Sequence, residues 1–369
     1  MTPDDVPGVN RLHRNVWWPE RSVEGWEWLA RNPATVESKS PIGLILDDDQ
    51  GQPAAFLGCF AQRFVEGDRV FYGATGFSFI VPRDVRGGTR HLIPAFLAQS
   101  QFVLHYTLNA NALSSPIYKR FGLMAWPNET HDLKLSWITN PVVCGTARGL
   151  RQLVKFKPAA VNWLGESLMP WSSSLSPSRL GDGIVLVEDR SARSAYDRFW
   201  QNLRAEGRFM ADRSPQMMEW RLADPDQPRP LIHLARVQDG EVTGHALAMM
   251  AKYSSIEPPS LEIIDLAALA GHGSAVRDLA GALIRLAGPL GAAKVRLQVL
   301  GPQLLTDLGD LAGQARREGG YGHCHVGLVP GFEGHQSWQP TPFDGDFSIC
   351  LRPLPRRGIR AGSLPSQAA

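Results

Sequence analysis

A turn rich in arginine and glycine follows a mostly apolar stretch in the first third of the chain. Residues 76–81 predict a strand, and Arg86-Gly87-Gly88-Thr89 opens a helix expected from about 89 to 101. Unpaired backbone N–H groups at a helix N-terminus bind anions, and glycine lets a phosphate approach the backbone closely. Arg83 and Arg90 add positive charge nearby. The turn therefore predicts a phosphate site, while a plain surface loop with the same composition is the alternative.

A second segment with an ordered pattern, residues 111–123, follows the next expected strand at 102–108. Asn111 starts a helix, and Tyr118 lies on the same face two turns later. Gly122 is placed to cap the C-terminus of that helix. The order is therefore strand, arginine–glycine turn, helix, strand and a second, short helix.

The chain repeats this order once, at an offset near 190 residues. Trp28 and Trp220 each stand five residues before a proline that ends an expected helix, Pro33 and Pro225. A hairpin follows in both copies, at 42–60 and 231–250. Expected strands at 76–81 and 261–266 then lead into helices at 89–101 and 274–287. Strands at 102–108 and 294–300 come next, each with one more helix behind it, the second at 302–317.

The duplication predicts two domains with mixed α/β sheets. We expect an N-terminal domain at 1–140, a connector at 141–189, a C-terminal domain at 190–354 and a flexible tail at 355–369. The connector carries Trp163, Leu164, Leu168 and Trp171, whose side chains would not stay solvated. It is therefore expected to pack partly onto both domains.

The first copy resembles the GNAT superfamily of acyl-CoA-dependent N-acyltransferases. Residues 81–92 resemble the pyrophosphate-binding motif of that family, and Asn111-x6-Tyr118-x-x-Phe121-Gly122 resembles its second conserved segment. The similarity covers 41–123 well and, through the duplication, the whole chain in outline. It implies two tandem GNAT-like domains.

The resemblance also implies a role for each matching residue. Backbone N–H groups of Phe79, Ile80 and Val81 would bond the pantetheine arm and face the thioester carbonyl. Asn111 would orient the pantetheine, and Tyr118 would protonate the departing thiolate. His105 is the most attractive titratable group near the thioester, and a hydrogen-bonded core histidine is the alternative. Glu66, Glu129, His131 and a chain of waters are the other candidates for the general base. The residues that would wrap the pyrophosphate are Arg86, Gly87, Gly88, Thr89, Arg90 and His91.

The implied activity is transfer of an acyl group, acetyl or longer, from acyl-CoA to an amine of a small molecule or amino sugar. The amine would attack the thioester directly, so orientation, oxyanion stabilisation and a general acid suffice, without a metal. The second copy has no tyrosine equivalent to Tyr118, so the chemistry is assigned to the first half.

Two other functions fit the same pattern. Thr89 and His91 stand where the family usually has glycine, which favours a protein that binds acyl-CoA without catalysis. An aminoacyl-tRNA-dependent transferase of the related doubled fold is the other alternative.

Three further groups of polar residues could bind a substrate. Asp344 and Asp346 flank Gly345 and are interpreted either as an exposed turn or as carboxylates that bind or deprotonate a cationic amine. Arg213 and Arg221 lie by a helix and form a charged face, or else bind an anionic substrate. His323-Cys324-His325 would alternate along a strand, so three metal ligands could not converge there.

The composition limits the remaining classes. The 369 residues carry a formal net charge of +2, which argues against a nucleic-acid partner. The sequence has neither an apolar run long enough to span a membrane nor an apolar N-terminal leader, so we expect a cytoplasmic protein. Its four cysteines lie far apart and predict reduced thiols.

Overall fold

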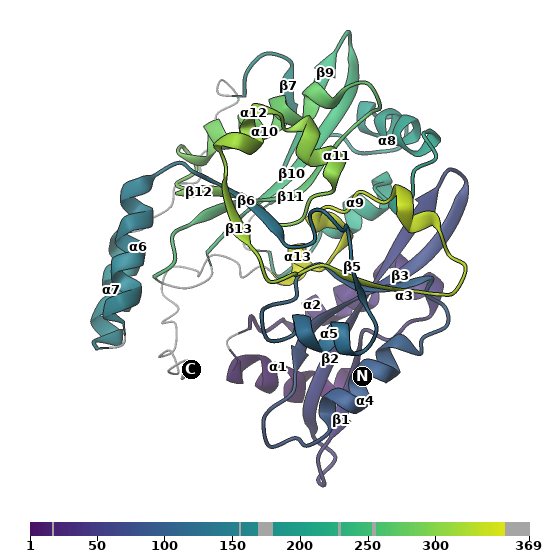
Figure 1. Cartoon of the computed structure of the whole chain (residues 1–369), viewed down its shortest axis with the longest axis vertical. Helices are drawn as coiled ribbons and strands as arrows, with labels where there is room; N and C mark the ends of the chain where they lie inside the picture. The colour runs from purple at the N-terminus through teal and green to yellow at the C-terminus, as the bar shows by residue number, and fades with distance from the viewer. Residues whose placement is uncertain (17, 155, 169–179, 228–229, 253–255, 351–369) are drawn as a thin grey trace.

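The computed structural model describes residues 1–16, 18–154, 156–168, 180–227, 230–252 and 256–350. Within these residues the chain forms two mixed sheets of seven strands each, with helices packed on them (Figure 1). The predicted mixed α/β class is therefore confirmed. The expected tail at 355–369 and Trp171 of the connector lie outside the described residues.

The elements follow the duplicated order that the sequence predicts, and polar side chains cap several helices. Ser22, Asn32, Asn140 and Ser194 each accept a hydrogen bond from a backbone N–H in the first turn of a helix. The first half contains α1 (Val6–Asn15), α2 (Val23–Ala30), α3 (Pro33–Ser38), β1 (Gly43–Asp47), β2 (Pro53–Glu66), β3 (Arg69–Ile80), α4 (Gly88–Leu97), β4 (Leu104–Thr107), α5 (Ser115–Arg120), β5 (Met124–Ala125) and β6 (Leu133–Ile138).

The connector and the second half continue the chain. The connector contains α6 (Pro141–Leu153), α7 (Pro158–Leu168) and β7 (Ile184–Leu186). The second half contains α8 (Ala195–Ala205), β8 (Met210–Ala211), α9 (Pro215–Leu222), β9 (Ile232–Gln238), β10 (Glu241–Ala251), β11 (Ser260–Ala268), α10 (Gly273–Ala287), β12 (Lys294–Leu297), α11 (Pro302–Asp307), α12 (Asp310–Gln314), β13 (Arg316–Gly319), β14 (His325–Leu328), the 3₁₀ turn η4 (Pro342–Asp344) and α13 (Phe347–Cys350).

Six strands of each sheet follow the same order, and the seventh differs in its place. The first sheet runs β1-β2-β3-β4-β14-β5, with β8 paired to β2, and the second runs β7-β9-β10-β11-β12-β6-β13. In each sheet one parallel pair, β3–β4 or β11–β12, lies among antiparallel neighbours. A helix crosses over between the two parallel strands, α4 in the first half and α10 in the second. The structure thus repeats one unit twice.

Each half contributes to the sheet of the other half, and the second half also gives the short β8, which pairs with β2. β6, from the first half, pairs with β12 and β13 in the second sheet. β14, from the second half, pairs with β4 and β5 in the first sheet. Neither sheet is complete without the other half, so the two units are expected to fold as one body.

The cores follow the alternation of side chains along the strands. Leu261, Ile263, Val295 and Leu297 point to the same face of the second sheet and pack under α10. A separate cluster contains residues of both halves and fills the junction, including Phe64, Tyr106, Phe209, Leu247 and Trp338.

The two repeated tryptophans meet at this junction. The rings of Trp28 and Trp220 stack with centroids 4.3 Å apart. Each indole Nε1 donates a hydrogen bond to the backbone carbonyl oxygen of the other residue, at 2.8 and 3.1 Å. Equivalent side chains make equivalent bonds, as in a two-fold symmetric interface.

Two predictions about elements were wrong. The helix expected at 302–317 ends at Asp307, because Gly309 adopts a positive φ of 53° and residues 316–319 pair with β6 instead. The connector does not pack broadly on both halves in its described part. Its helices α6 and α7 stand beside the body (Figure 1), and Trp163 is 67% exposed.

Candidate functional site

β3 and β4 pair over a short distance and then diverge. The parallel pairing is limited to three residues of each strand: Gly73 pairs with Leu104, Ala74 with His105 and Thr75 with Tyr106. β3 then continues to Ile80, and among the described residues no strand pairs with 76–80 on that side. The sheet therefore opens at the carboxyl ends of two parallel strands, where ligands bind in α/β folds.

A β-bulge lies at the point of divergence. Ser78 has a positive φ of 47° although it is buried, and the register with β2 shifts between Phe77 and Ile80. Phe77 and Ile80 consequently point to the same face, toward α1 and α2. A bulge of this kind redirects backbone N–H groups and is frequent beside active sites.

The arginine–glycine turn forms the wall of an open pocket of about 550 Å³. Gly87, with a φ of 79°, precedes α4, and no side chain caps the helix. Gly88 must lack a side chain, because a Cβ there would lie 2.8 Å from Cγ1 of Val81. The other residues that line the pocket include Thr89, Arg90, Ile117, Arg120 and Phe121. A basic pocket at an uncapped helix N-terminus suits a phosphate group.

The two other motif residues of the turn stay at the surface. Arg86 and His91 are exposed, and the ring of His91 lies next to Gly87. Neither side chain lines the pocket. Their contact with a phosphate therefore stays a prediction.

Tyr118 extends from α5 into the opening between β3 and β4. Its hydroxyl bonds to Thr107 of β4, and a Cβ on Gly76 of β3 would lie 3.3 Å from it. Burial raises the pKa of Tyr118, and the nearby carboxyl of Asp346 raises it further. The tyrosine is therefore a protonated hydroxyl placed where the strands separate.

β14, from the other half of the chain, holds α5 in position. Ser115 Oγ and Nε2 of His325 lie 3.0 Å apart, and the ring of His325 stacks on Tyr118 at 6.3 Å. The expected cap Gly122 has a φ of 87°, and Leu123 donates a backbone hydrogen bond to Tyr118 at the helix end.

Asn111 fixes the approach to α5. Its Oδ1 accepts hydrogen bonds from the backbone of Leu113 and Ser114, both at 2.9 Å. The α-helix itself begins at Ser115, four residues later than expected. Asn111 is exposed, and its side-chain amide remains the group that the prediction assigns to pantetheine.

His105 lies on the α4 face of β4, between aromatic rings. Phe96 and Phe102 contact it edge to face at 5.1 and 5.6 Å. Burial lowers its pKa to about 4. The side chain is a neutral imidazole at neutral pH, packed as part of the core.

Asp344 and Asp346 are not in an exposed turn, and that interpretation was wrong. Both are buried, with exposed fractions of 0% and 1%. Asp344 accepts hydrogen bonds from Arg213 at 2.9 Å and from Trp338 at 2.7 Å. Its partners are thus supplied by the protein itself.

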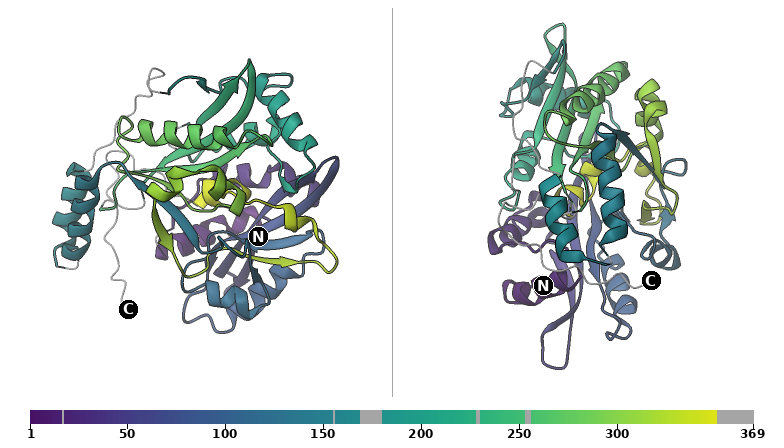
Figure 2. Two further views of the ribbon diagram at one scale, coloured as in Figure 1. Left: turned by 45° about the horizontal axis from the view of Figure 1, so that its top comes forward. Right: turned by 90° about the vertical axis from the view of Figure 1, so that its left-hand side faces the viewer.

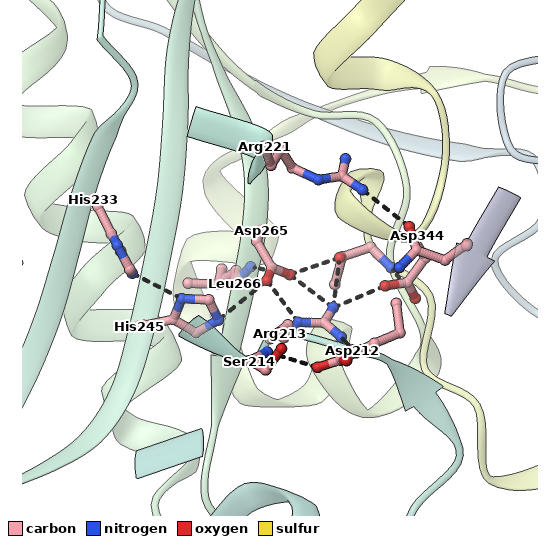
Figure 3. Close-up of polar contacts among 12 residues, drawn as sticks. Asp212, Arg213, Ser214, Arg221, His233, His245, Asp265, Leu266 and Asp344 are labelled. Carbon is pink, nitrogen blue, oxygen red and sulfur yellow. Dashed lines mark hydrogen bonds and ion pairs between the residues drawn. The ribbon is translucent and has the colours of Figure 1, made fainter. Parts of the chain in front are cut away.

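Arg213 is the centre of a buried ionic cluster (Figure 3). It donates to both carboxylate oxygens of Asp265, at 2.7 and 2.9 Å, in addition to Asp344. Burial alone would lower the pKa of Arg213, but the two aspartates raise it. His245 lies 3.1 Å from Asp265 on the other side, and His233 lies behind it. The charged-face interpretation of Arg213 was therefore wrong.

Arg221 is buried as well and was also misplaced on a charged face. Its guanidinium bonds to Ser348 at 2.8 Å and Gln62 at 3.0 Å, and it stacks 4.0 Å from the centre of the Phe343 ring. Burial lowers its pKa to about 10. Arg213 and Arg221 together hold the segment 341–350 inside the junction.

Asp346 lies at the end of this segment, beside the opening. Its Oδ2 is 3.5 Å from the amide of Asn109, and the thiol of Cys350 is its neighbour. Burial raises the pKa of Asp346, and hydrogen bonds from Cys350 and Asn109 oppose the shift. Unlike Asp344, this carboxyl has no arginine or lysine bonded to it among the described residues.

The sequence pattern did not indicate that Asp346, His325 and Tyr118 meet. These three come from the chain end, β14 and α5, and long-range strand pairing brings them together. Tyr118 was indicated by its spacing from Asn111, whereas Asp346 and His325 had only the signal of chemical type, a carboxylate pair and a histidine pair. Within the described residues no group of three or more His, Cys, Asp or Glu side chains could hold a metal ion.

Comparison with solved structures identifies the fold. A protein of unknown function from Enterococcus faecalis V583, described as a probable N-acyltransferase, superposes with a TM-score of 0.51 at 11% identity, covering 89% of this chain and 71% of that chain. Saccharomyces cerevisiae N-myristoyltransferase with bound myristoyl-CoA gives a TM-score of 0.49 at 11% identity, covering 88% and 76%. No family model matches the sequence, and no curated protein matches it. The chain has the doubled GNAT fold.

The buried ionic cluster gives a stability prediction. Arg213→Met leaves Asp265 and Asp344 buried without a cation, so we expect a loss of about 3–5 kcal/mol in the free energy of unfolding. Arg198→Met removes an exposed pair with Glu241 and should cost less than about 1 kcal/mol. Urea denaturation of both variants measures the difference. Equal losses would show that the cluster is not a stabilising centre.

His105 gives a pH prediction. The unfolded histidine takes up a proton below its ordinary pKa of 6.5, whereas the native one stays neutral down to about 4. Stability is therefore lost as the pH falls through this window. His105→Phe removes the group that takes up this proton on unfolding. The decrease of Tm with falling pH should therefore be less steep in the variant, by the slope that uptake of about one proton causes. An unchanged slope would mean that His105 titrates normally in the native protein.

Proposed function

We propose that the chain is an acyl-CoA-dependent N-acyltransferase whose site lies in the first half. The observation that carries the proposal is the divergence of β3 and β4 at the Ser78 bulge, with the Tyr118 hydroxyl between them. The basic pocket at α4 lies at the other end of the same opening, next to Val81. One elongated ligand with a diphosphate at one end and a thioester at the other fits this arrangement.

The residues present suit acyl-CoA as the co-substrate. Backbone N–H groups at the start of α4, with Arg90 and Arg120, would hold the diphosphate. N–H groups of the 79–81 segment would face the thioester oxygen, where negative charge develops during transfer. Arg86, His91 and Asn111 are exposed and are further proposed contacts.

The chemistry requires two proton transfers. The amine nitrogen forms a bond to the thioester carbonyl carbon, and the carbon–sulfur bond breaks. Tyr118 would give its proton to the departing sulfur, since its raised pKa keeps the hydroxyl protonated at neutral pH. Asp346 would bind the amine and take the proton that nitrogen loses. The raised pKa of Asp346 makes it a stronger base than an ordinary aspartate.

Asp344 and Arg213 are not proposed as substrate contacts, because each is satisfied by partners inside the protein. His105 is not proposed as the base, because its ring is enclosed by Phe96 and Phe102. Their contribution to the site is structural.

The site test uses three variants. Arg86→Glu should weaken acetyl-CoA binding about tenfold or more, because it reverses a charge at the diphosphate end. Tyr118→Phe and Asp346→Asn should retain binding and lower kcat by about 10²–10⁴-fold. Calorimetry measures the binding, and thiol release with a panel of small amines and amino sugars measures turnover.

Arg148→Glu on α6 and Tyr72→Phe on β3 are the matched controls and should change neither quantity. Unchanged binding in Arg86→Glu together with unchanged turnover in Tyr118→Phe would overturn the site assignment. Tight binding without thiol release over the whole amine panel would instead favour a protein that binds acyl-CoA without catalysis.

The space beside the bulge favours a short acyl group. The cavity next to Ser78 holds only about 10 Å³ and is closed by His13, Trp18, Phe77, Ile349 and Cys350. This volume is close to that of one water molecule. An acetyl group is therefore the proposed acyl group, and the acceptor is proposed to be a small amine.

A chain-length series tests this proposal. With CoA thioesters of increasing length, kcat/KM should fall by about tenfold or more beyond a few carbons, because each added methylene has no space in the packed core. Phe77→Ala should restore part of the loss for the longer thioesters. Equal turnover of acetyl and long-chain thioesters by the unmodified protein would contradict the acetyl assignment.

A further inference from the structure

The connector helices form an arm that contacts the rest of the protein over a small area. α6 and α7 lie side by side and away from both sheets (Figures 1 and 2). Their shared core contains Ala147, Leu150 and Val161, and Ile256 is the residue that the body contributes. An ion pair of 3.2 Å between Arg151 and Glu257 adds to this contact. Within the described residues, most of the surface of the arm therefore lies outside its contact with the body.

Large apolar side chains lie on this outer surface. The exposed fractions are 74% for Val142, 54% for Leu153, 80% for Phe156 and 67% for Trp163. Val142 and Leu153 are about three helical turns apart, so they share one face of α6, away from Ala147. Phe156 lies at the turn between the two helices. In sequence, this turn is the part of the arm that is farthest from the two points where the arm joins the body. Exposed apolar side chains gathered in one segment mark an interaction site.

The same arm carries positive charge. Residues 141–168 contain Arg148, Arg151, Lys155 and Lys157, and Glu166 is their one acidic residue. The net charge of this segment, +3, exceeds the +2 of the whole chain. Arg148 and Lys157 are exposed, and Lys157 follows Phe156 directly at the turn. Basic residues beside exposed Trp, Phe and Leu are typical of helices that lie on anionic bilayers.

We propose that the α6–α7 arm docks the protein on an anionic lipid surface. Phe156 and neighbouring apolar side chains would enter the boundary between headgroups and acyl chains, while Arg148 and Lys157 would contact acidic headgroups. A protein-binding surface is the weaker match, because lysine is depleted at such interfaces. Docking would be peripheral, since no helix in the described part of the chain is long and apolar enough to cross a membrane.

Sedimentation of the full-length protein with vesicles tests the proposal. The protein should bind vesicles of mixed phosphatidylglycerol and phosphatidylcholine, and should bind pure phosphatidylcholine at least about tenfold more weakly. Arg148→Gln should weaken binding to the anionic vesicles about fivefold, as expected for one charge near the surface. Phe156→Ser should weaken it by a comparable or larger factor by removing buried apolar area.

Matched substitutions elsewhere keep the test specific. Val36→Ser on α3 and Arg317→Gln on β13 replace exposed residues of the same kinds and should leave vesicle binding unchanged. Acetyl-CoA binding should be the same in all four variants, which separates this proposal from the proposed function. Light scattering without lipid gives the molecular mass. Absence of vesicle binding would overturn lipid docking. A mass that falls from dimer to monomer in Phe156→Ser would also overturn it and identify a protein-binding arm.

Discussion

The arrangement at the junction depends on the buried ionic cluster in which Arg213 pairs with Asp265 and Asp344. Two buried aspartates cost free energy unless a cation meets them in good geometry. Arg213 meets this need with a bidentate pair to Asp265 and a third bond to Asp344. Because Asp344 belongs to the final described segment and Asp265 to β11, this pairing holds residues 341–350 at the centre of the described structure. Asp346, two residues later, is thereby placed beside Tyr118.

The exchange of β6 and β14 makes the two halves interdependent. β14 completes the first sheet and brings His325 against Ser115 and Tyr118. The general acid proposed for the first half is therefore oriented by a residue of the second half. A duplicated chain whose copies only packed against each other would lack this coupling.

The sequence predicted what depends on local patterns. The strand, arginine–glycine turn and helix, and the Gly122 cap, follow from residues close together in the chain, and the repeat revealed the doubled fold. Burial of Asp344 and Arg213 could not be predicted, because these two partners are 131 residues apart in the chain and Asp265 is 52 residues from Arg213. Arg316 and Arg317 belonged to the helix expected at 302–317, but pairing with β6 decided their conformation. Long-range pairing overrode local preference in each of these cases.

The same ion pair explains why chemistry is proposed for one half only. β11 carries a bulge at its divergence from β12, as β3 does from β4, and Asp265 is the first residue after that bulge to pair with β10. In β3 the corresponding residue is Ile80, which pairs with Phe56 of β2. In the first half, Tyr118 lies at the opening that is proposed to bind the ligand. In the second half a carboxylate neutralised by Arg213 and bonded to His245 occupies the equivalent place. In the proposed function the first opening receives the acyl-CoA, whereas the ion pair that joins the halves lies at the corresponding position in the second half.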